Sequence, residues 1–169
     1  MITKSEGTVV SVGQGKVNSE TGFHRPMPVE VGESVIFGKF NGEEIKYNGE
    51  THTVIRDDDI LVKFAKAAGV KLESAQATFD NVLIKVEKID VADTASGILI
   101  SATAKKAVVS SIGEVMKVGP GRHAFNGELM GMDVLPGDMV KFRDYAAQEI
   151  SLDGEEYAIV KMSDILAKF

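Results

Sequence analysis

Three histidines and two runs containing aspartate are the residues whose chemistry could serve a metal site or acid–base catalysis. His24, His52 and His123 are the only histidines, and they fall in different turns without the spacing that a metal site requires. The aspartates of "RDDDIL" and "SDIL" stand where turns and caps commonly place this residue. Cysteine is absent, which excludes disulfides, zinc–thiolate sites and cysteine nucleophiles. We therefore expect no catalytic residue, no metal site and no enzyme activity.

Two glycine-rich segments raise the question of a nucleotide cofactor. "VGQGKV" and "VGPGRH" each carry two closely spaced glycines. A dinucleotide-binding loop connects a strand to a helix, whereas both of these segments lead into further turns and short strands. We interpret the glycines as turn residues and expect no cofactor.

The overall composition narrows the class of protein further. The chain has 169 residues, of which 44% are hydrophobic and 26% charged, as in ordinary globular domains. Its net charge of −6, with scattered Lys and Arg, argues against binding to nucleic acid. No apolar run approaches the roughly 18 residues of a membrane helix, so we expect no membrane contact. The opening "MITKSEGTVV" does not resemble a signal or transit peptide.

One apolar tripeptide stands in an unusual context and is a candidate binding element. Ile98, Leu99 and Ile100 follow Gly97 within "SGILISATAKKAVVSS", whose other residues are mostly small or polar. A buried strand edge would explain three large aliphatic side chains. These flanks, however, offer little to cover them and are typical of a mobile loop. Buried strand and exposed docking element both remain open on this pattern.

The elements that must position these residues come in two copies. "GESVIFGKFNGEEIKYNGETHTVIRDDDILVKF" (32–64) aligns without a gap with "GDMVKFRDYAAQEISLDGEEYAIVKMSDILAKF" (137–169), and twelve of the 33 pairs are identical. Upstream, "GTVVSVGQG" (7–15) matches "GEVMKVGPG" (113–121). We interpret this as a tandem duplication.

Each copy is predicted to consist of short strands. Apolar residues alternate with polar ones, as around Val82, Ile84 and Val86, and turn dipeptides such as Asn-Gly and Asp-Gly recur at close intervals. This pattern favours an all-β fold built from small barrels or sandwiches. The second copy has about 35 residues before Gly113 and the first has six before Gly7. We therefore expect the first copy to lack its leading strand and the loop that follows.

The predicted domains are residues 1–64, incomplete at the N-terminus, and residues 77–169, which form a complete copy. Residues 65–76, "AKAAGVKLESAQ", are rich in Ala, Lys and Glu with little apolar periodicity. We interpret them as a short interdomain linker.

The order of motifs in the second copy resembles the GroES family of co-chaperonins. The resemblance rests on "NVLIKVEK", the loop with "SGILIS", "IGEVMKVGPG", the hairpin "RHAFNGELMGMDV", "LPGDMVKF" and "DGEEYAIVKMSDILA". Two such domains in one chain resemble the double-domain co-chaperonins of plastids. The resemblance implies two tandem GroES-like small β-barrels and a location in the chloroplast stroma.

The resemblance also implies a function, partners and site residues. Family members form ring-like oligomers that cap an ATP-dependent chaperonin ring of the 60 kDa class and assist folding of enclosed, unfolded client proteins. ATP is bound by the chaperonin. The loop that docks on the chaperonin maps to Gly97, Ile98, Leu99 and Ile100. The hairpins that form the roof of the cap map to about 16–23 and 122–130, and their candidate site residues are Phe23, Phe125, Asn126, Gly127 and Glu128.

Docking through the tripeptide would be weak for one loop and strong for several. Burying three aliphatic side chains yields on the order of 5–9 kcal/mol, at roughly 1.5–3 kcal/mol each. Ordering a loop costs about 1–2 kcal/mol per residue, which offsets most of that gain. Several loops on one ring act together through effective concentration, so we expect reversible capping.

Two other function classes fit parts of the pattern. Medium-chain dehydrogenases contain a domain of GroES-like fold, but they also need a dinucleotide-binding half, which we do not find. A scaffold or regulatory protein of the same fold that does not cap a chaperonin is the remaining alternative. Phe23 and Phe125 could contact clients or neighbours, or pack in a core, and we expect Tyr145 to pack at the end of a barrel.

Overall fold

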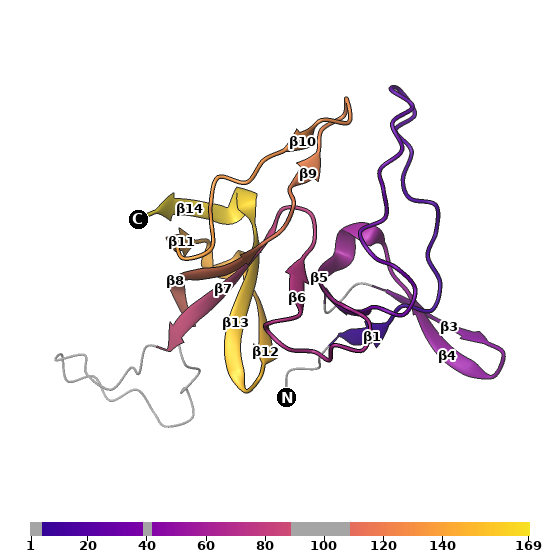
Figure 1. Ribbon diagram of the computed structural model, residues 1–169, viewed down its shortest axis with the longest axis horizontal. Coiled ribbons are helices and arrows are strands. Elements are labelled where there is room, and N and C mark those ends of the chain that lie inside the picture. The colour runs from indigo at the N-terminus through magenta and orange to yellow at the C-terminus, as the bar shows by residue number, and fades with distance from the viewer. Residues whose placement is uncertain (1–4, 39–41, 89–108) are drawn as a thin grey trace.

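The computed structural model describes residues 5–38, 42–88 and 109–169, and strands dominate these residues (Figure 1). Three single-turn 3₁₀ helices, η1 (Asp57–Asp59), η2 (Asp144–Ala146) and η3 (Met162–Asp164), are the helical elements among them. The all-β prediction is confirmed. The strands are β1 (Glu6–Thr8), β2 (Ser34–Phe37), β3 (Glu43–Tyr47), β4 (Glu50–Val54), β5 (Ile60–Phe64), β6 (Ala75–Ala77), β7 (Asn81–Lys88), β8 (Val109–Val118), β9 (Arg122–His123), β10 (Leu129–Met130), β11 (Met139–Phe142), β12 (Gln148–Leu152), β13 (Glu155–Lys161) and β14 (Ile165–Lys168).

The second repeat is built on one antiparallel sheet of six strands. Its order is β12-β13-β7-β8-β11-β14, so β7 lies in the middle, between β13 and β8. Alternate apolar side chains of these strands point to one side and form a core. The buried members of that core are Val82, Ile84, Val86, Val115, Val134, Val140, Phe142, Ala158 and Val160.

The first repeat has the same register but two separate sheets. Its strands form a four-stranded sheet, β1-β2-β5-β6, and a two-stranded sheet, β3-β4. The pair Gly7↔Val35 repeats the pair Gly113↔Val140, and the bulge before Phe37 repeats the bulge before Phe142. Its buried core is smaller, with Val29, Val35 and Ile60 as the buried members.

The two repeats are joined through β6 and a shared apolar core. β6 pairs with β5 of the first repeat, and Val62 stands opposite Ala77. Apolar side chains of both repeats meet beneath this junction: Ile36, Leu61, Val62, Phe64, Ala75, Leu83, Leu152, Tyr157 and Ile159. Residues 65–76 are therefore more than a spacer, because their end becomes a strand of the first sheet. The boundaries 1–64, 65–76 and 77–169 stay our proposal.

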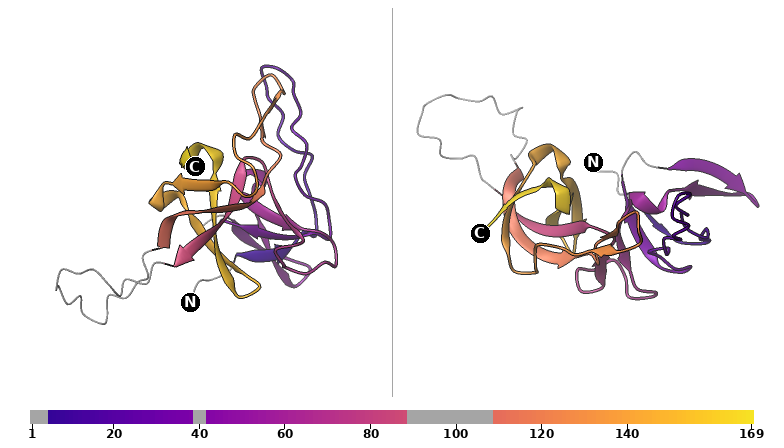
Figure 2. Two further views of the ribbon diagram at one scale, coloured as in Figure 1. Left: turned by 60° about the vertical axis from the view of Figure 1, so that its left-hand side comes forward. Right: turned by 90° about the horizontal axis from the view of Figure 1, so that it is seen from above.

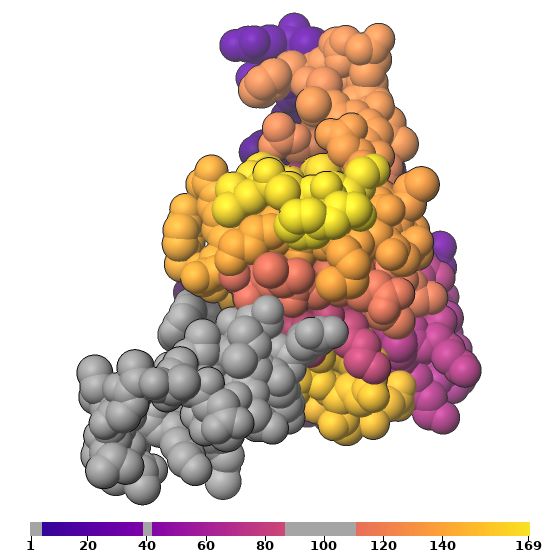
Figure 3. All heavy atoms as spheres, turned by 90° about the vertical axis from the view of Figure 1, so that its left-hand side faces the viewer, coloured from indigo at the N-terminus to yellow at the C-terminus, as the bar shows by residue number. Residues whose placement is uncertain are grey.

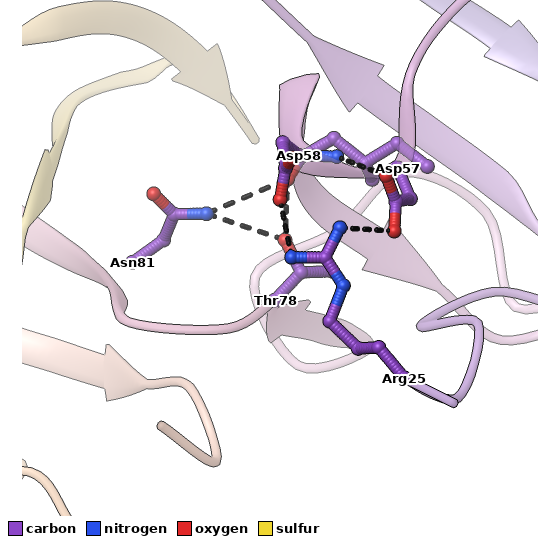
Figure 4. Close-up of polar contacts among 6 residues, drawn as sticks. Arg25, Asp57, Asp58, Thr78 and Asn81 are labelled. Atoms are coloured by element: carbon purple, nitrogen blue, oxygen red, sulfur yellow. Dashed lines mark hydrogen bonds and ion pairs between the residues drawn. The ribbon is translucent and has the colours of Figure 1, made fainter. Parts of the chain in front are cut away.

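Two buried polar side chains connect the start of β7 to the first repeat (Figure 4). The Thr78 hydroxyl lies 2.5 Å from the Ile60 carbonyl oxygen and 3.1 Å from that of Leu61. Asn81 Nδ2 donates to the Thr78 hydroxyl at 3.2 Å and to the Ile60 carbonyl at 3.4 Å. Both side chains are almost fully buried. Buried polar groups must be paired, so these bonds fix how β7 leaves the junction.

Within the described part of the chain, no helix has the length and apolar character needed to span a membrane.

Candidate functional site

Two hairpins project from the same side of the molecule. The first hairpin is residues 16–25, where Val17 and His24 form a β-bridge and the Arg25 N–H donates to the Lys16 carbonyl at 2.9 Å. The second hairpin is residues 122–130, built on β9 and β10. Asn18 in the first and Asn126 in the second accept backbone N–H bonds through Oδ1, which holds each tip in a turn.

The tips of the two hairpins touch, and the two views of Figure 2 place them side by side. The Thr21 hydroxyl donates to the Phe125 carbonyl oxygen at 2.9 Å, and Asn18 Nδ2 reaches the same oxygen at 3.5 Å. The rings of Phe23 and His123 lie 5.2 Å apart, centroid to centroid. Residues about a hundred positions apart thereby form one continuous projection.

The predicted hairpin residues differ in exposure. Phe125 is 83% exposed, so its ring is available to a partner, whereas Phe23 is half-buried. Gly127 has φ 88°, and a Cβ there would lie 2.6 Å from Phe23 Cδ2, so the contact between hairpins requires glycine. Asn126 and Glu128 are exposed beside Phe125. Tyr145, expected to pack, is 81% exposed on η2 instead.

A cleft of about 850 Å³ opens between the hairpins and the junction of the repeats. Arg25, Phe79, Asn81, Arg122 and His123 are among its lining residues. Arg25 Nε, Asn81 Oδ1 and His123 Nδ1 are buried and make no hydrogen bond within the described part of the chain. Carboxylates of Asp58 and Asp80 also line this cleft, so its charge is mixed.

Arg25 is a site residue that the sequence did not reveal (Figure 4). Its guanidinium binds Asp57 Oδ2 at 2.5 Å through Nη2 and Asp58 Oδ1 at 2.7 Å through Nη1, and it lies 5.0 Å from the centre of the Phe79 ring. It ties the first hairpin to η1 and to the turn before β7. The matching position of the second repeat holds Met130. Comparison of the two repeats therefore shows no conserved charge that would mark Arg25 as a site residue.

The predicted docking residues Gly97, Ile98, Leu99 and Ile100 lie outside the described residues. The strands that flank them are described. β7 and β8 pair as far as Lys88↔Val109, so the two described strand ends that flank the tripeptide's segment lie side by side. β7 ends on the side of the molecule away from β9 and β10 (Figure 1).

β14 forms one edge of the second repeat's sheet and lies at the molecular surface (Figure 3). Leu166 is 55% exposed, whereas the matching Leu61 of β5 is 6% exposed under the shared core. β14 pairs with β11, and Lys168 Nζ lies 3.4 Å from Oδ2 of Asp138, the residue before β11. The pKa of Asp138 is lowered, mainly by the hydrogen bond that its carboxylate accepts from the Leu135 N–H and further by the positive charge of Lys168.

The histidines and carboxylates form no metal site in the residues that the structure describes. His24 and His123 lie in the two hairpins, and His52 lies in β4 with Nδ1 3.3 Å from the Glu50 carbonyl oxygen. The three histidines belong to separate elements, and His52 lies in a strand and not in a turn.

Comparison with known proteins places these features in a family. The family described as "Chaperonin 10 Kd subunit" (Cpn10) matches residues 2–64 and again residues 74–169. The chain is 30% identical over 162 residues to the "20 kDa chaperonin, chloroplastic" of Spinacia oleracea, and it is 31% identical to the protein of that name from Arabidopsis thaliana. Each match covers 95% of this chain, which spans 60% and 61% of the length of those relatives.

Single-domain relatives match about half of the chain. The "Co-chaperonin GroES" of Syntrophomonas wolfei is 43% identical over 89 residues, which are 53% of this chain and 91% of that protein. These relatives are co-chaperonins, so the prediction of a non-enzymatic protein is confirmed, as is the prediction of two tandem GroES-like domains. The chain, with its repeated strand register and its paired hairpins, belongs to the chaperonin 10 Kd subunit family.

Proposed function

We propose that this co-chaperonin caps an ATP-dependent chaperonin ring through Ile98, Leu99 and Ile100. Family membership carries the proposal, because the tripeptide stands between the segments "NVLIKVEK" and "IGEVMKVGPG" of this chain, within residues 74–169 that match the family. ATP would be bound by the chaperonin, and unfolded clients would contact the cap only inside the closed cavity.

The arrangement of the described residues supports a cap. The two joined hairpins project from one side, and β7 ends on the other side (Figure 1). A cap needs a roof over the cavity and anchors directed at the rim of the chaperonin. In this proposal the hairpins, with exposed Phe125, form part of the roof.

The experiment measures binding to a chaperonin ring of the 60 kDa class in the presence of ATP. We expect the wild-type chain to bind and Leu99→Asp or Ile98→Asp to lose binding, because a carboxylate is costly to bury in an apolar groove. Thr103→Asp, which adds the same charge in the same segment, is the matched control and should bind normally. Undiminished binding by both aspartate variants of the tripeptide would refute the docking assignment.

We also propose that copies of the chain associate through β14 into a ring-like oligomer. Within the chain, β6 covers the equivalent strand β5 and shields Leu61 and Phe64. The corresponding Leu166 and Phe169 are exposed, with Phe169 at 74%. A strand of a neighbouring copy would cover them in the way that β6 covers β5.

We propose the plastid stroma as the location of this protein. The relatives from Spinacia oleracea and Arabidopsis thaliana are both named as chloroplastic. Fractionation of the source cells, with this protein detected by antibody, tests the location, and recovery outside plastids would contradict it.

A further inference from the structure

Three of the five asparagines are followed by glycine, namely Asn41, Asn48 and Asn126. In such a pair the backbone nitrogen of glycine can attack the side-chain amide carbon of asparagine, because glycine has no Cβ to hinder the approach. In a folded chain the attack depends on whether that nitrogen and that side chain are held by hydrogen bonds. Asn41 lies outside the described residues, so the structure bears on the other two pairs.

The Asn126-Gly127 pair, at the tip of the second hairpin, has both groups engaged. The Gly127 N–H donates to the Ala124 carbonyl oxygen at 3.0 Å, and Asn126 Oδ1 accepts the Glu128 N–H at 3.1 Å. The ring of Phe23 lies directly against Gly127, where it leaves no room for a Cβ. Attack on the Asn126 amide would therefore have to break two hydrogen bonds and disturb the contact between the hairpins.

The Asn48-Gly49 pair lacks these restraints. It forms the two-residue turn between β3 and β4, beyond the paired residues Tyr47 and Glu50. Asn48 and Gly49 are both exposed. Within the part of the chain that the structure describes, neither the Asn48 side chain nor the Gly49 N–H makes a hydrogen bond. The attacking nitrogen and the amide carbon are thus open to solvent, and neither has to give up a bond before it reacts.

The matching turn of the second repeat shows which product the fold accepts. Asp153-Gly154 occupies the place of Asn48-Gly49. Asn48 and Asp153 have left-handed backbones with φ 53° and 52°, and the two glycines have φ 84° and 83°. Both turns therefore have positive φ at both central positions, as a type I′ turn requires. An aspartate at position 48 fits this geometry, whereas an isoaspartate would add a methylene to the backbone of the turn.

We propose that Asn48 is a site of spontaneous deamidation. The Gly49 nitrogen, after losing its proton to a base in the solvent, forms a bond to Asn48 Cγ. The bond from Cγ to the side-chain nitrogen breaks, so that ammonia leaves and a succinimide ring remains. Water then opens the ring at either carbonyl and gives aspartate or isoaspartate. The reaction consumes one water and adds one negative charge to the turn beside Glu50.

The test incubates the intact 169-residue chain at mildly alkaline pH and follows deamidation by mass spectrometry of tryptic peptides. Cleavage after Lys46 and Arg56 gives peptide 47–56, and cleavage after Arg122 and Lys141 gives peptide 123–141, so each peptide carries one Asn-Gly pair. We expect peptide 47–56 to convert at least about fivefold faster, a factor that one hydrogen bond commonly contributes. Conversion of peptide 47–56 that is no faster than that of peptide 123–141 would overturn the proposal.

The same chain unfolded in guanidinium chloride is the matched control. The two pairs have similar neighbours, with Tyr47 and Phe125 before them and Glu50 and Glu128 after them. Unfolding releases the hydrogen bonds of Gly127 and Asn126, so both peptides should then convert at the same rate. A preference for peptide 47–56 that persists in the unfolded chain would arise from sequence alone and would contradict the structural assignment.

Asn48→Asp tests whether the fold accepts the aspartate product. Circular dichroism should show the variant folded, and its thermal midpoint should stay close to that of wild type, because exposed substitutions change stability little. A variant that does not fold would show that this turn rejects aspartate, and the inferred product would be wrong. Neither the rates nor this variant depends on a chaperonin, so both are independent of the capping function.

Discussion

At the scale of single residues, Arg25 joins three elements at the junction of the repeats. Its side chain is 20% exposed and that of Asp57 is 13% exposed, so their ion pair is less screened than a surface pair. Arg25 also contacts Phe79, which precedes β7 in a left-handed conformation with φ 49°. The hairpin, η1 and the start of the second repeat are linked through this one guanidinium.

Arg25→Met tests that link, because methionine is the residue at the matching position of the second repeat. We expect a loss of about 1–3 kcal/mol in the free energy of unfolding, since charge-assisted hydrogen bonds to a poorly exposed Asp57 are removed. Urea denaturation followed by circular dichroism gives the value. The exposed Arg56→Met should change stability by less than about 0.5 kcal/mol. Equal stability of the two variants would show that the ion pairs contribute little.

Tyr157 gives a prediction for alkaline pH. Burial, followed by its hydrogen bond to Glu155 Oε2 at 2.9 Å, raises the pKa of Tyr157 to about 12. The unfolded chain releases this proton near pH 10 and the folded chain releases it later. Tyr157 therefore contributes stability that is complete below about pH 10 and is lost as the pH rises toward 12.

The measurement is an ultraviolet difference titration of wild type against Tyr157→Phe, which isolates the Tyr157 phenolate. We expect its midpoint near pH 12, accompanied by loss of native structure. A midpoint near pH 10 with the fold intact would mean that the hydroxyl is exposed to solvent.

At the scale of elements, the glycines of the two "VG-x-G" turns should respond differently to the same change. A Cβ on Gly119 would lie 2.1 Å from the Phe79 carbonyl oxygen, whereas a Cβ on the matching Gly13 meets nothing within 4 Å. The backbone before β7 approaches Gly119 closely, and the described first repeat has no strand in that place. The two turns share the same sequence motif, but the backbone that surrounds them in space differs.

We therefore expect Gly119→Ala to lower the thermal midpoint by several degrees or to prevent folding, since backbone must move. Gly13→Ala should leave the midpoint within about one degree. Differential scanning fluorimetry of the purified variants measures both. If Gly119→Ala folds with an unchanged midpoint, the close approach of the Phe79 carbonyl is not maintained in solution.

The same element-scale comparison shows how far the sequence could predict the fold. The repeat and its strands followed from alternation and turn residues, and the registers of β1–β2 and β8–β11 agree pair for pair. The role of residues 75–77 did not follow, because "AQA" is too short and too weakly apolar to indicate a strand. Pairing with β5 and burial under the shared core decide it.

At the scale of the whole molecule, β14 should control self-association. We expect the wild-type chain to form oligomers in sedimentation velocity experiments and Leu166→Asp to shift it toward the monomer. Leu166 is 55% exposed, so the variant should still fold. Leu129→Asp changes an equally exposed leucine, 53%, in the second hairpin and is the control. A monomeric wild type, or an unaltered Leu166→Asp, would contradict association through β14.

The sequence by itself determined the all-β class and the duplication, because these depend on local alternation and on turn residues. The positions of the two hairpins were implied by the resemblance to the GroES family. The sequence also singled out Ile98, Leu99 and Ile100 as a candidate docking element, because their flanking residues are mostly small or polar. Only the tertiary structure decided which copies of equivalent residues are buried. Thr53 and Ala158, or Leu166 and Leu61, occupy matching positions in the chain, and their exposure depends on whether another strand lies beside them. Whether a strand edge is buried or exposed depends on its neighbours in space, which no local sequence pattern encodes.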